Sequence, residues 1–486
     1  MGESIKSQAI SGVKWSAVSK IYMTVVAVLQ IAILTRFLNK EDFGLMGIAI
    51  LVNAFCTIFV DMGMSAAALH EKDLTKSQFS SFYWFNLASG LLFSMLVSAV
   101  SPIIASYYKR PELVGIISIT SISIFISSIS SLQRTLQQKK MNFRFMSIVD
   151  VISSTIGIVA NVILAVKGYG VYSLVWSQLI TGVFGAIAYL GIALKERNLS
   201  IHFCFSEVRE ALKIGIYQSG SAVLDFISRE MDSFIISSNM TMEFFGIYTL
   251  CKNLTMRIYM VINPIITNVL TPIFAKIQDE KDRLSEAYKH VVEVLGFVNF
   301  PIYTIVAICS YSIISILYGK MYCDYAFVMS CLAIYYAFQS CANPIGSLLI
   351  ATGRTDRGFI WTIFRISFTF VYLNIASRFD LNIFALFILL TPIITSYPSW
   401  YIKLRVVSTI NYKESLWIIL KGFVSCIPFL PLFFLDRIID TPIISASLIT
   451  VFFVLGFYFI NKKYRPVMLN YIIGIMKQAI NNKKVA

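Results

Sequence analysis

The sequence predicts an all-α protein that crosses a lipid bilayer about 14 times. Two features of its composition support this class: 57% of the 486 residues are hydrophobic, and only 14% are charged. Soluble domains carry about 25% charged residues. The third observation is that apolar runs of about 20 residues, the length that a helix needs to span hydrocarbon, recur along the whole chain. Composition alone does not indicate what the protein does.

Fourteen apolar runs are predicted as membrane-spanning helices, and the connections between them are too short to hold a soluble domain. The segment 466–486, after the last run, is basic and amphipathic, and we expect it to lie on the cytoplasmic membrane surface. The predicted spans are, approximately, 13–37, 43–68, 80–106, 112–134, 145–166, 170–193, 212–238, 244–274, 287–311, 325–351, 357–377, 381–402, 414–435 and 441–461.

The distribution of Lys and Arg predicts that both chain termini are cytoplasmic. With this orientation the cytoplasmic segments hold about 27 Lys and Arg residues, and the outer loops hold about eight. Lys403, just after the twelfth predicted span, is counted among the cytoplasmic residues. An even number of spans also requires both termini on one side. The net charge of +15 is therefore attributed to these loops and not to a nucleic-acid partner.

A short internal repeat predicts two pseudo-symmetric lobes of six helices each. The pattern Glu-x-Phe-Gly-aliphatic occurs at Glu41–Leu45 and again at Glu243–Ile247, an offset of 202 residues. Chance is the alternative explanation, but both copies stand at the same place relative to the spans. The offset covers six helices, so the halves share one orientation, as in transporters built from parallel repeats. The lobes are predicted at 1–200 and 201–410, with two additional helices within 411–465.

The seventh predicted span carries four charges between Asp225 and Asp232. Ionised side chains near mid-bilayer are costly and normally face a bundle interior or a water-filled cavity. On a helix Asp225, Arg229 and Asp232 share one face, and Glu230 points about 100° away. Three acids and one Arg sum to −2, so this stretch alone is not an anion site. Either the span lines a polar cavity, or Arg229 pairs with Asp225 in a neutralised cluster that only packs helices.

Seven short motifs along the chain are informative as an ordered set. They are SGVKWS at 11–16, EDFGL at 41–45, VDMGMSAA at 60–67, FYWFN at 82–86, GYGVYSLV at 168–175, DSFII at 232–236 and LIATGR at 349–354. In this order the set resembles the Wzx-type polysaccharide flippases, the lipopolysaccharide biosynthesis branch of the MOP superfamily. That superfamily also includes multidrug antiporters of the MATE type and lipid II flippases. The resemblance covers about residues 1–410.

The resemblance implies a two-lobed transporter of the bacterial inner membrane. Its implied cargo is a polyprenyl-diphosphate-linked oligosaccharide, moved from the cytoplasmic to the periplasmic leaflet for O-antigen, capsule or exopolysaccharide biosynthesis. A polysaccharide polymerase and the chain-length machinery are the implied protein partners. No catalytic site, cofactor or metal site is predicted, because the three His residues are scattered and the eight Cys residues contain no CxxC pair.

For such a cargo, intramembrane cations are the candidate binding residues. Arg matches a phosphate with two parallel hydrogen bonds, whereas Lys acts as a point charge. Arg229 and Arg257 fall near mid-bilayer on adjacent predicted spans, and we expect them to contact the diphosphate. Lys252 and Lys20 are secondary candidates. For Lys20 the alternative is that its side chain extends to the cytoplasmic surface.

Intramembrane carboxylates are the candidates for ion coupling, since many membrane pumps use acids that gain and lose a proton. These candidates are Asp61, Asp225 and Glu293. For Asp61 the alternative is a hydrogen bond that packs helices, and for Glu293 it is solvation near the cytoplasmic surface.

Two other functions compete with a flippase. A cation-coupled multidrug antiporter of the same fold should have a mainly acidic and apolar cavity, and the cations within the spans argue against it. A membrane-embedded glycan polymerase usually needs a sizeable outer loop, whereas the predicted outer loops are nearly all short.

Overall fold

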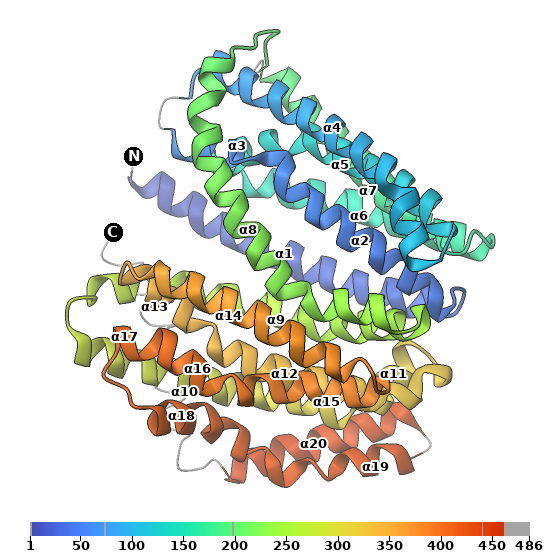
Figure 1. The fold of residues 1–486 in the computed structure, drawn as a ribbon, viewed down its shortest axis with the longest axis vertical. Coiled ribbons are helices and arrows are strands. Elements are labelled where there is room, and N and C mark those ends of the chain that lie inside the picture. Colours follow the sequence, from blue (N-terminus) through green and yellow to red (C-terminus); the bar gives the residue numbers. More distant parts are fainter. Residues whose placement is uncertain (1, 72–73, 197–198, 440, 461–486) are drawn as a thin grey trace. The chain divides into compact units, whose positions relative to one another are not determined.

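The computed structural model describes residues 2–71, 74–196, 199–439 and 441–460, and every regular element within them is a helix (Figure 1). This confirms the predicted all-α class. The chain divides into two compact units, Met1–Gly246 and Ile247–Ala486, which are described one at a time. The division falls inside one long helix, and the six-helix lobes at 1–200 and 201–410 stay a prediction. The predicted surface segment 466–486 lies outside the described residues.

In the first unit the consecutive helices α4 and α5, and α6 and α7, pack against each other across short connections. Helix α7 also packs on α5, and α1 packs on α6; in both of these pairs the two helices run parallel. Helix α8 lies against α2, α3 and α4. The helices are α1 (Gly2–Leu34), α2 (Lys40–Asp61), α3 (Met64–His70), α4 (Lys76–Tyr108), α5 (Glu112–Lys139), α6 (Phe143–Val166), α7 (Tyr172–Lys195) and α8 (Phe205–Asn239).

Small residues bring α4 and α5 together. A Cβ on Gly90 would overlap the side chain of Ser128, so only glycine permits this approach. The Asn86 side chain crosses to α5, where it donates to the Ser131 hydroxyl at 2.6 Å. Small and hydroxyl-bearing residues are typical of helix contacts in membranes, where apolar side chains gain little by leaving lipid.

The second predicted span, 43–68, is broken into α2 and α3. Met62 and Gly63 have positive φ angles of 38° and 81°, a conformation that ends a helix. A Cβ on Gly63 would lie 2.5 Å from the Gly215 Cα atom of α8, and a Cβ on Gly215 would overlap the Met62 carbonyl oxygen. Glycine is needed at both positions, because the backbone of the break lies directly on α8.

The second unit surrounds a continuous apolar core in which α10 packs on α12 and α18, and α12 packs on α15. Its elements are α9 (Met242–Lys276), which begins in the first unit, α10 (Lys281–Ile308), α11 (Ser310–Leu317), η1 (Lys320–Tyr325), α12 (Ala326–Ala342), α13 (Pro344–Ala351), α14 (Thr355–Ala376), α15 (Leu381–Ile394), α16 (Ser396–Ser399), the π-helix η2 (Trp400–Leu404), α17 (Arg405–Val407), α18 (Tyr412–Val424), η3 (Ile427–Phe429), α19 (Leu432–Ile438) and α20 (Pro442–Ile460).

A buried carboxylate links helices α19 and α20 to the core of the second unit. Asp436 of α19 is fully buried and accepts hydrogen bonds from the backbone and hydroxyl of Ser312 on α11 and from the hydroxyl of Ser445 on α20. These three bonds supply the partners that a buried carboxylate needs. The presence of a buried carboxylate at Asp436 is therefore explained by the packing of these helices alone.

Within the described residues, eleven helical stretches are long and apolar enough to cross a membrane. The three long helices α1, α8 and α9 are not among them. Together with these three, the stretches would make the predicted fourteen, and that count stays a prediction. The protein is a multi-pass membrane protein.

Candidate functional site

Helix α8 presents a polar face that its neighbours leave open. Asp225 and Arg229 are both exposed, and in the described part of the chain neither forms an ion pair. Tyr217, two turns before Asp225, is 81% exposed. The predicted alternative, in which Arg229 is neutralised by Asp225 one turn away, is therefore not what the structure contains. An exposed, unpaired Arg on a predicted membrane helix is able to bind an anion.

The other two acids of this cluster are less accessible. Glu230 and Asp232 are half-buried, and the Ser233 hydroxyl donates to Glu230 Oε2 at 3.1 Å. The cluster thus divides into an open pair, Asp225 and Arg229, and two partly covered acids, although Asp232 was predicted to share the face of Asp225 and Arg229. The division could not be predicted from sequence, because it depends on which elements pack on α8.

Helix α9 carries two of the four predicted binding cations, Lys252 and Arg257. Lys252 is buried, with 6% of its surface exposed. Arg257 is half-buried beside Tyr318, whose hydroxyl donates to the Leu250 carbonyl at 3.1 Å. The Arg257 Nε atom is buried and has no hydrogen-bond partner among the described residues. Buried polar atoms are nearly always paired, so this guanidinium has donor capacity left for a ligand.

Lys20 is exposed on α1, the helix that packs on α6. The Tyr22 hydroxyl on the same helix lies 2.9 Å from the Thr155 hydroxyl of α6, which fixes the rotation of α1 there. The structure leaves Lys20 accessible, and its role as a secondary phosphate contact stays a prediction.

Two of the three carboxylates predicted for ion coupling have fixed partners. Asp61 accepts from the backbone and hydroxyl of Ser65, at 3.2 and 2.5 Å, and so caps the start of α3. Glu293 of α10 pairs with Lys421 of α18, next to the point where Gly296 and Gly422 bring these helices together. Only Asp225, among the three, is both exposed and without an ion pair in the described residues. Ion coupling by any of them stays a prediction.

The two copies of the repeated motif lie against each other within the first unit. A Cβ on Gly44 would overlap the Met242 carbonyl oxygen, and a Cβ on Gly246 would overlap the Lys40 carbonyl oxygen. The two contacts are reciprocal, as expected for elements related by an approximate two-fold axis. Lys40 and Glu243 add an ion pair of 2.9 Å across the same contact.

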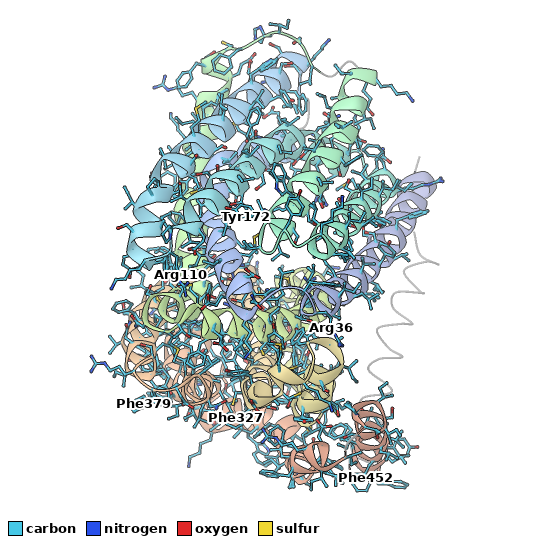
Figure 2. All side chains as sticks on the ribbon, turned by 90° about the vertical axis from the view of Figure 1, so that its right-hand side faces the viewer. Arg36, Arg110, Tyr172, Phe327, Phe379 and Phe452 are labelled. Atoms are coloured by element: carbon cyan, nitrogen blue, oxygen red, sulfur yellow. The ribbon has the colours of Figure 1, made fainter. Side chains whose placement is uncertain are left out.

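Neighbouring residues stabilise the start of α2 and the start of α7. Arg110, which follows α4 and is labelled in Figure 2, donates to Glu41 at 3.1 Å. The Tyr172 hydroxyl at the start of α7 lies over Gly115 of α5, only 2.6 Å from the position that a Cβ there would occupy. These contacts connect neighbouring helices at the predicted outer end of the first unit.

Lys403 lies one residue beyond the predicted end of the twelfth span, and the helical segment continues through it. It belongs to the π-helix η2 and only 7% of its surface is exposed. Its predicted cytoplasmic location stays a prediction. No cluster of three or more His, Cys, Asp or Glu side chains suited to a metal ion occurs in the described residues.

The helical fold has a counterpart among solved membrane proteins. The solved structure "Lipid II flippase MurJ, inward closed conformation" matches 94% of this chain and 100% of its own, with a TM-score of 0.70 and 14% sequence identity. At that identity the likeness shows the fold alone.

The chain belongs to the polysaccharide biosynthesis protein family, which matches residues 33–327. It is 29% identical to teichuronic acid biosynthesis protein TuaB of Bacillus subtilis (strain 168) over 358 residues, 74% of each chain. It is 25% identical to lipopolysaccharide biosynthesis protein WzxC of Escherichia coli (strain K12) over 434 residues, 85% of each chain. These matches confirm the family that the seven motifs indicated.

Proposed function

We propose that the protein flips polyprenyl-diphosphate-linked oligosaccharides from the cytoplasmic to the periplasmic leaflet of the bacterial inner membrane. The product is used for a cell-surface polysaccharide. The relatives that carry this proposal are described as biosynthesis proteins of teichuronic acid and lipopolysaccharide, and the fold neighbour is described as a lipid II flippase. The protein acts as a transporter and not as an enzyme.

The chemistry of the cargo explains why unpaired cations are needed. A diphosphate-linked sugar is large, polar and negative, so it requires a hydrated, cationic path through the membrane. Arg229 on α8 and Arg257 on α9 are proposed to contact the diphosphate, with Lys252 and Lys20 as secondary contacts. The observation that carries the proposal is that Arg229 is exposed without an ion pair in the described residues, while Arg257 retains a buried, unpartnered donor atom.

Transport proceeds by alternating access, in which the protein opens to one side of the membrane at a time. Both chain termini are placed in the cytoplasm, because Lys and Arg gather in the segments assigned to that side. An inside-negative membrane potential assists the outward movement of an anion by about 2.3 kcal/mol per elementary charge for each 100 mV. Association with a polysaccharide polymerase and chain-length machinery belongs to this proposal as well.

The test measures surface glycan in a strain that lacks its own flippase and expresses matched amounts of each variant. We expect Arg229→Ala to lower glycan display and Arg229→Lys to retain part of it, because Lys keeps the charge and loses the bidentate geometry. Full display by Arg229→Ala would remove this residue from the site.

A second measurement separates the proposal from a multidrug antiporter of the same fold. Cells that express the protein are loaded with a cationic dye, and efflux is followed with and without the wild-type chain. We expect no efflux that depends on the protein. Dye efflux without glycan display would show that the protein is a multidrug antiporter and not a flippase.

A further inference from the structure

Two cations and an aromatic ring lie together where α14 meets the π-helix η2. The Lys403 Nζ atom lies 4.3 Å from the centroid of the Trp361 ring. Arg365, one helical turn beyond Trp361, is close enough for its charge to act on Lys403. Lys403 is almost fully buried and Arg365 is half-buried. This cluster takes no part in the function proposed above.

The direction of the Lys403 side chain is unusual for a lysine near the end of a membrane helix. Lys residues near a membrane surface normally extend toward it. Side chains on a helix point toward its N-terminus, so Lys403 points away from the helix end at Val407. The cation–π contact with Trp361 is consistent with this direction, because Trp361 lies in the second turn of α14. The lysine is thus held inside the fold.

No carboxylate pairs with Lys403 in the described part of the chain. Burial of an ammonium group beside a second cation is costly unless an anion is present. Six acids of the second unit have partners other than Lys403. These acids are Glu280 with Arg283, Glu293 with Lys421, Asp356 with Arg354 and Arg357, Asp380 with the Ile383 backbone, Glu414 with Lys289, and Asp436 with two serines.

An aromatic ladder begins at the same place and follows α14. The ring centroids are 5.7 Å apart for Trp361 and Phe364, 6.0 Å for Phe364 and Phe368, and 5.3 Å for Phe368 and Tyr372. Tyr372 continues the ladder to Phe387 of α15, at 4.9 Å. All five rings are half-buried, so each retains accessible apolar surface. Eleven residues separate the first and last rings on α14, which is about 16 Å along the axis.

We propose that Lys403 and Arg365 bind the phosphate of a lipid whose hydrocarbon chain lies along the ladder from Trp361 to Phe387. A phosphate supplies the negative charge that buried Lys403 lacks, and Arg and Lys are the side chains that bind it best. The ladder supplies an apolar surface that continues from the charged end. A phospholipid headgroup and a polyprenyl diphosphate carry the same chemistry. The site stands independently of the transport function, since either lipid fits it.

The binding experiment uses the full chain, purified in detergent and examined by native mass spectrometry with added lipids. Phosphatidic acid is compared with diacylglycerol, and a polyprenyl diphosphate with the corresponding polyprenol, so that the members of each pair differ only in the phosphate or diphosphate group. We expect binding of the phosphate-bearing member only. The phosphate lipid that displaces the other identifies the natural occupant. Equal binding of the phosphate-free lipids would overturn the proposal.

Variants locate the site. We expect Lys403→Met to bind the phosphate lipid about tenfold more weakly, the size of one lost charge-assisted contact, and Arg365→Gln to show a similar loss. The matched control is Arg437→Gln, which removes an exposed cation stacked at 4.9 Å on Phe433 elsewhere in the unit. Arg365→Gln keeps the test valid if Lys403→Met folds poorly. Full binding by either folded variant, or an equal loss in Arg437→Gln, would overturn the assignment.

Fluorescence tests the hydrocarbon part of the site. Phosphate lipids with brominated chains are added to the wild-type chain and to Trp361→Phe, and the difference isolates Trp361 among the six Trp residues. At a lipid concentration below saturation, we expect the quenching assigned to Trp361 to be much weaker in Lys403→Met than in the wild-type chain. Quenching that is unchanged in Lys403→Met would show that the chain reaches Trp361 without the phosphate contact, and would contradict the proposal.

Discussion

Two predicted membrane charges on helix α8 are exposed and, within the part of the chain that the structure describes, unpaired, whereas two between α10 and α18 form an ion pair. On α8, Asp225 and Arg229 are one turn apart and exposed, and they form no ion pair in the described residues. Between α10 and α18, Glu293 and Lys421 come from distant parts of the chain and pair directly beside a close glycine contact. Both regions looked alike in the sequence. The difference teaches that a membrane charge is evidence for function only after its fixed partners are known.

The largest effect is expected where a donor remains unpartnered. Arg257→Ala should lower surface glycan about tenfold or more, because a charge-assisted contact with the diphosphate is lost. The folded yield should change little, since the Nε atom gives up no hydrogen bond to the described residues. Glycan display in the flippase-deletion strain measures the first quantity, and size-exclusion chromatography measures the second. If the folded yield fell as much as the glycan display, Arg257 would have a structural role and not a binding role.

For the ion pair of Glu293 and Lys421, substitutions should change stability more than transport. Lys421→Met should lower the free energy of unfolding by about 1–3 kcal/mol, because it leaves Glu293 without its partner. The double variant Glu293→Gln with Lys421→Met should recover most of this loss and keep glycan display. Denaturant titration of the purified chain measures stability. A double variant that is stable but displays no glycan would instead assign Glu293 to ion coupling.

The contact between the two motif copies is another fixed feature. Gly246→Ala should lower the free energy of unfolding by about 1–3 kcal/mol, because its new methyl group overlaps the Lys40 carbonyl. Gly220→Ala is the matched control on α8, where nothing lies within 4 Å. It should be neutral or stabilise the helix by about 0.5–1 kcal/mol. Similar losses in both variants would mean that the motif contact is not specific.

The smallest effect is expected at Asp61. Asp61→Asn keeps an oxygen that accepts from the Ser65 backbone, so the free energy of unfolding should fall by about 1 kcal/mol or less. Transport should stay near the wild-type level, as measured by glycan display at matched expression. A large loss of transport with unchanged stability would show that the Asp61 carboxyl group takes part in ion coupling.

The charged residues of the candidate site were predictable from the sequence, but which of them are paired and which are exposed was not. The sequence indicated Asp225, Arg229, Arg257 and Glu293 as membrane charges, because charged residues stand out in apolar runs. It did not reveal which of them have partners. Lys403 was missed because hydropathy ended the twelfth span at 402, one residue before it, and no local signal marks a π-helix.

The sequence by itself determined the all-α class, the order of the membrane helices and the family. A bilayer leaves a chain few choices: every backbone polar group must be paired within a helix, so apolar runs of span length report the fold directly. Only the tertiary structure decided which charges are satisfied. Glu293 and Lys421 are 128 residues apart, and their contact depends on how three-dimensional packing places α10 against α18. The same packing leaves Asp225 and Arg229 exposed and buries Lys403 against Trp361.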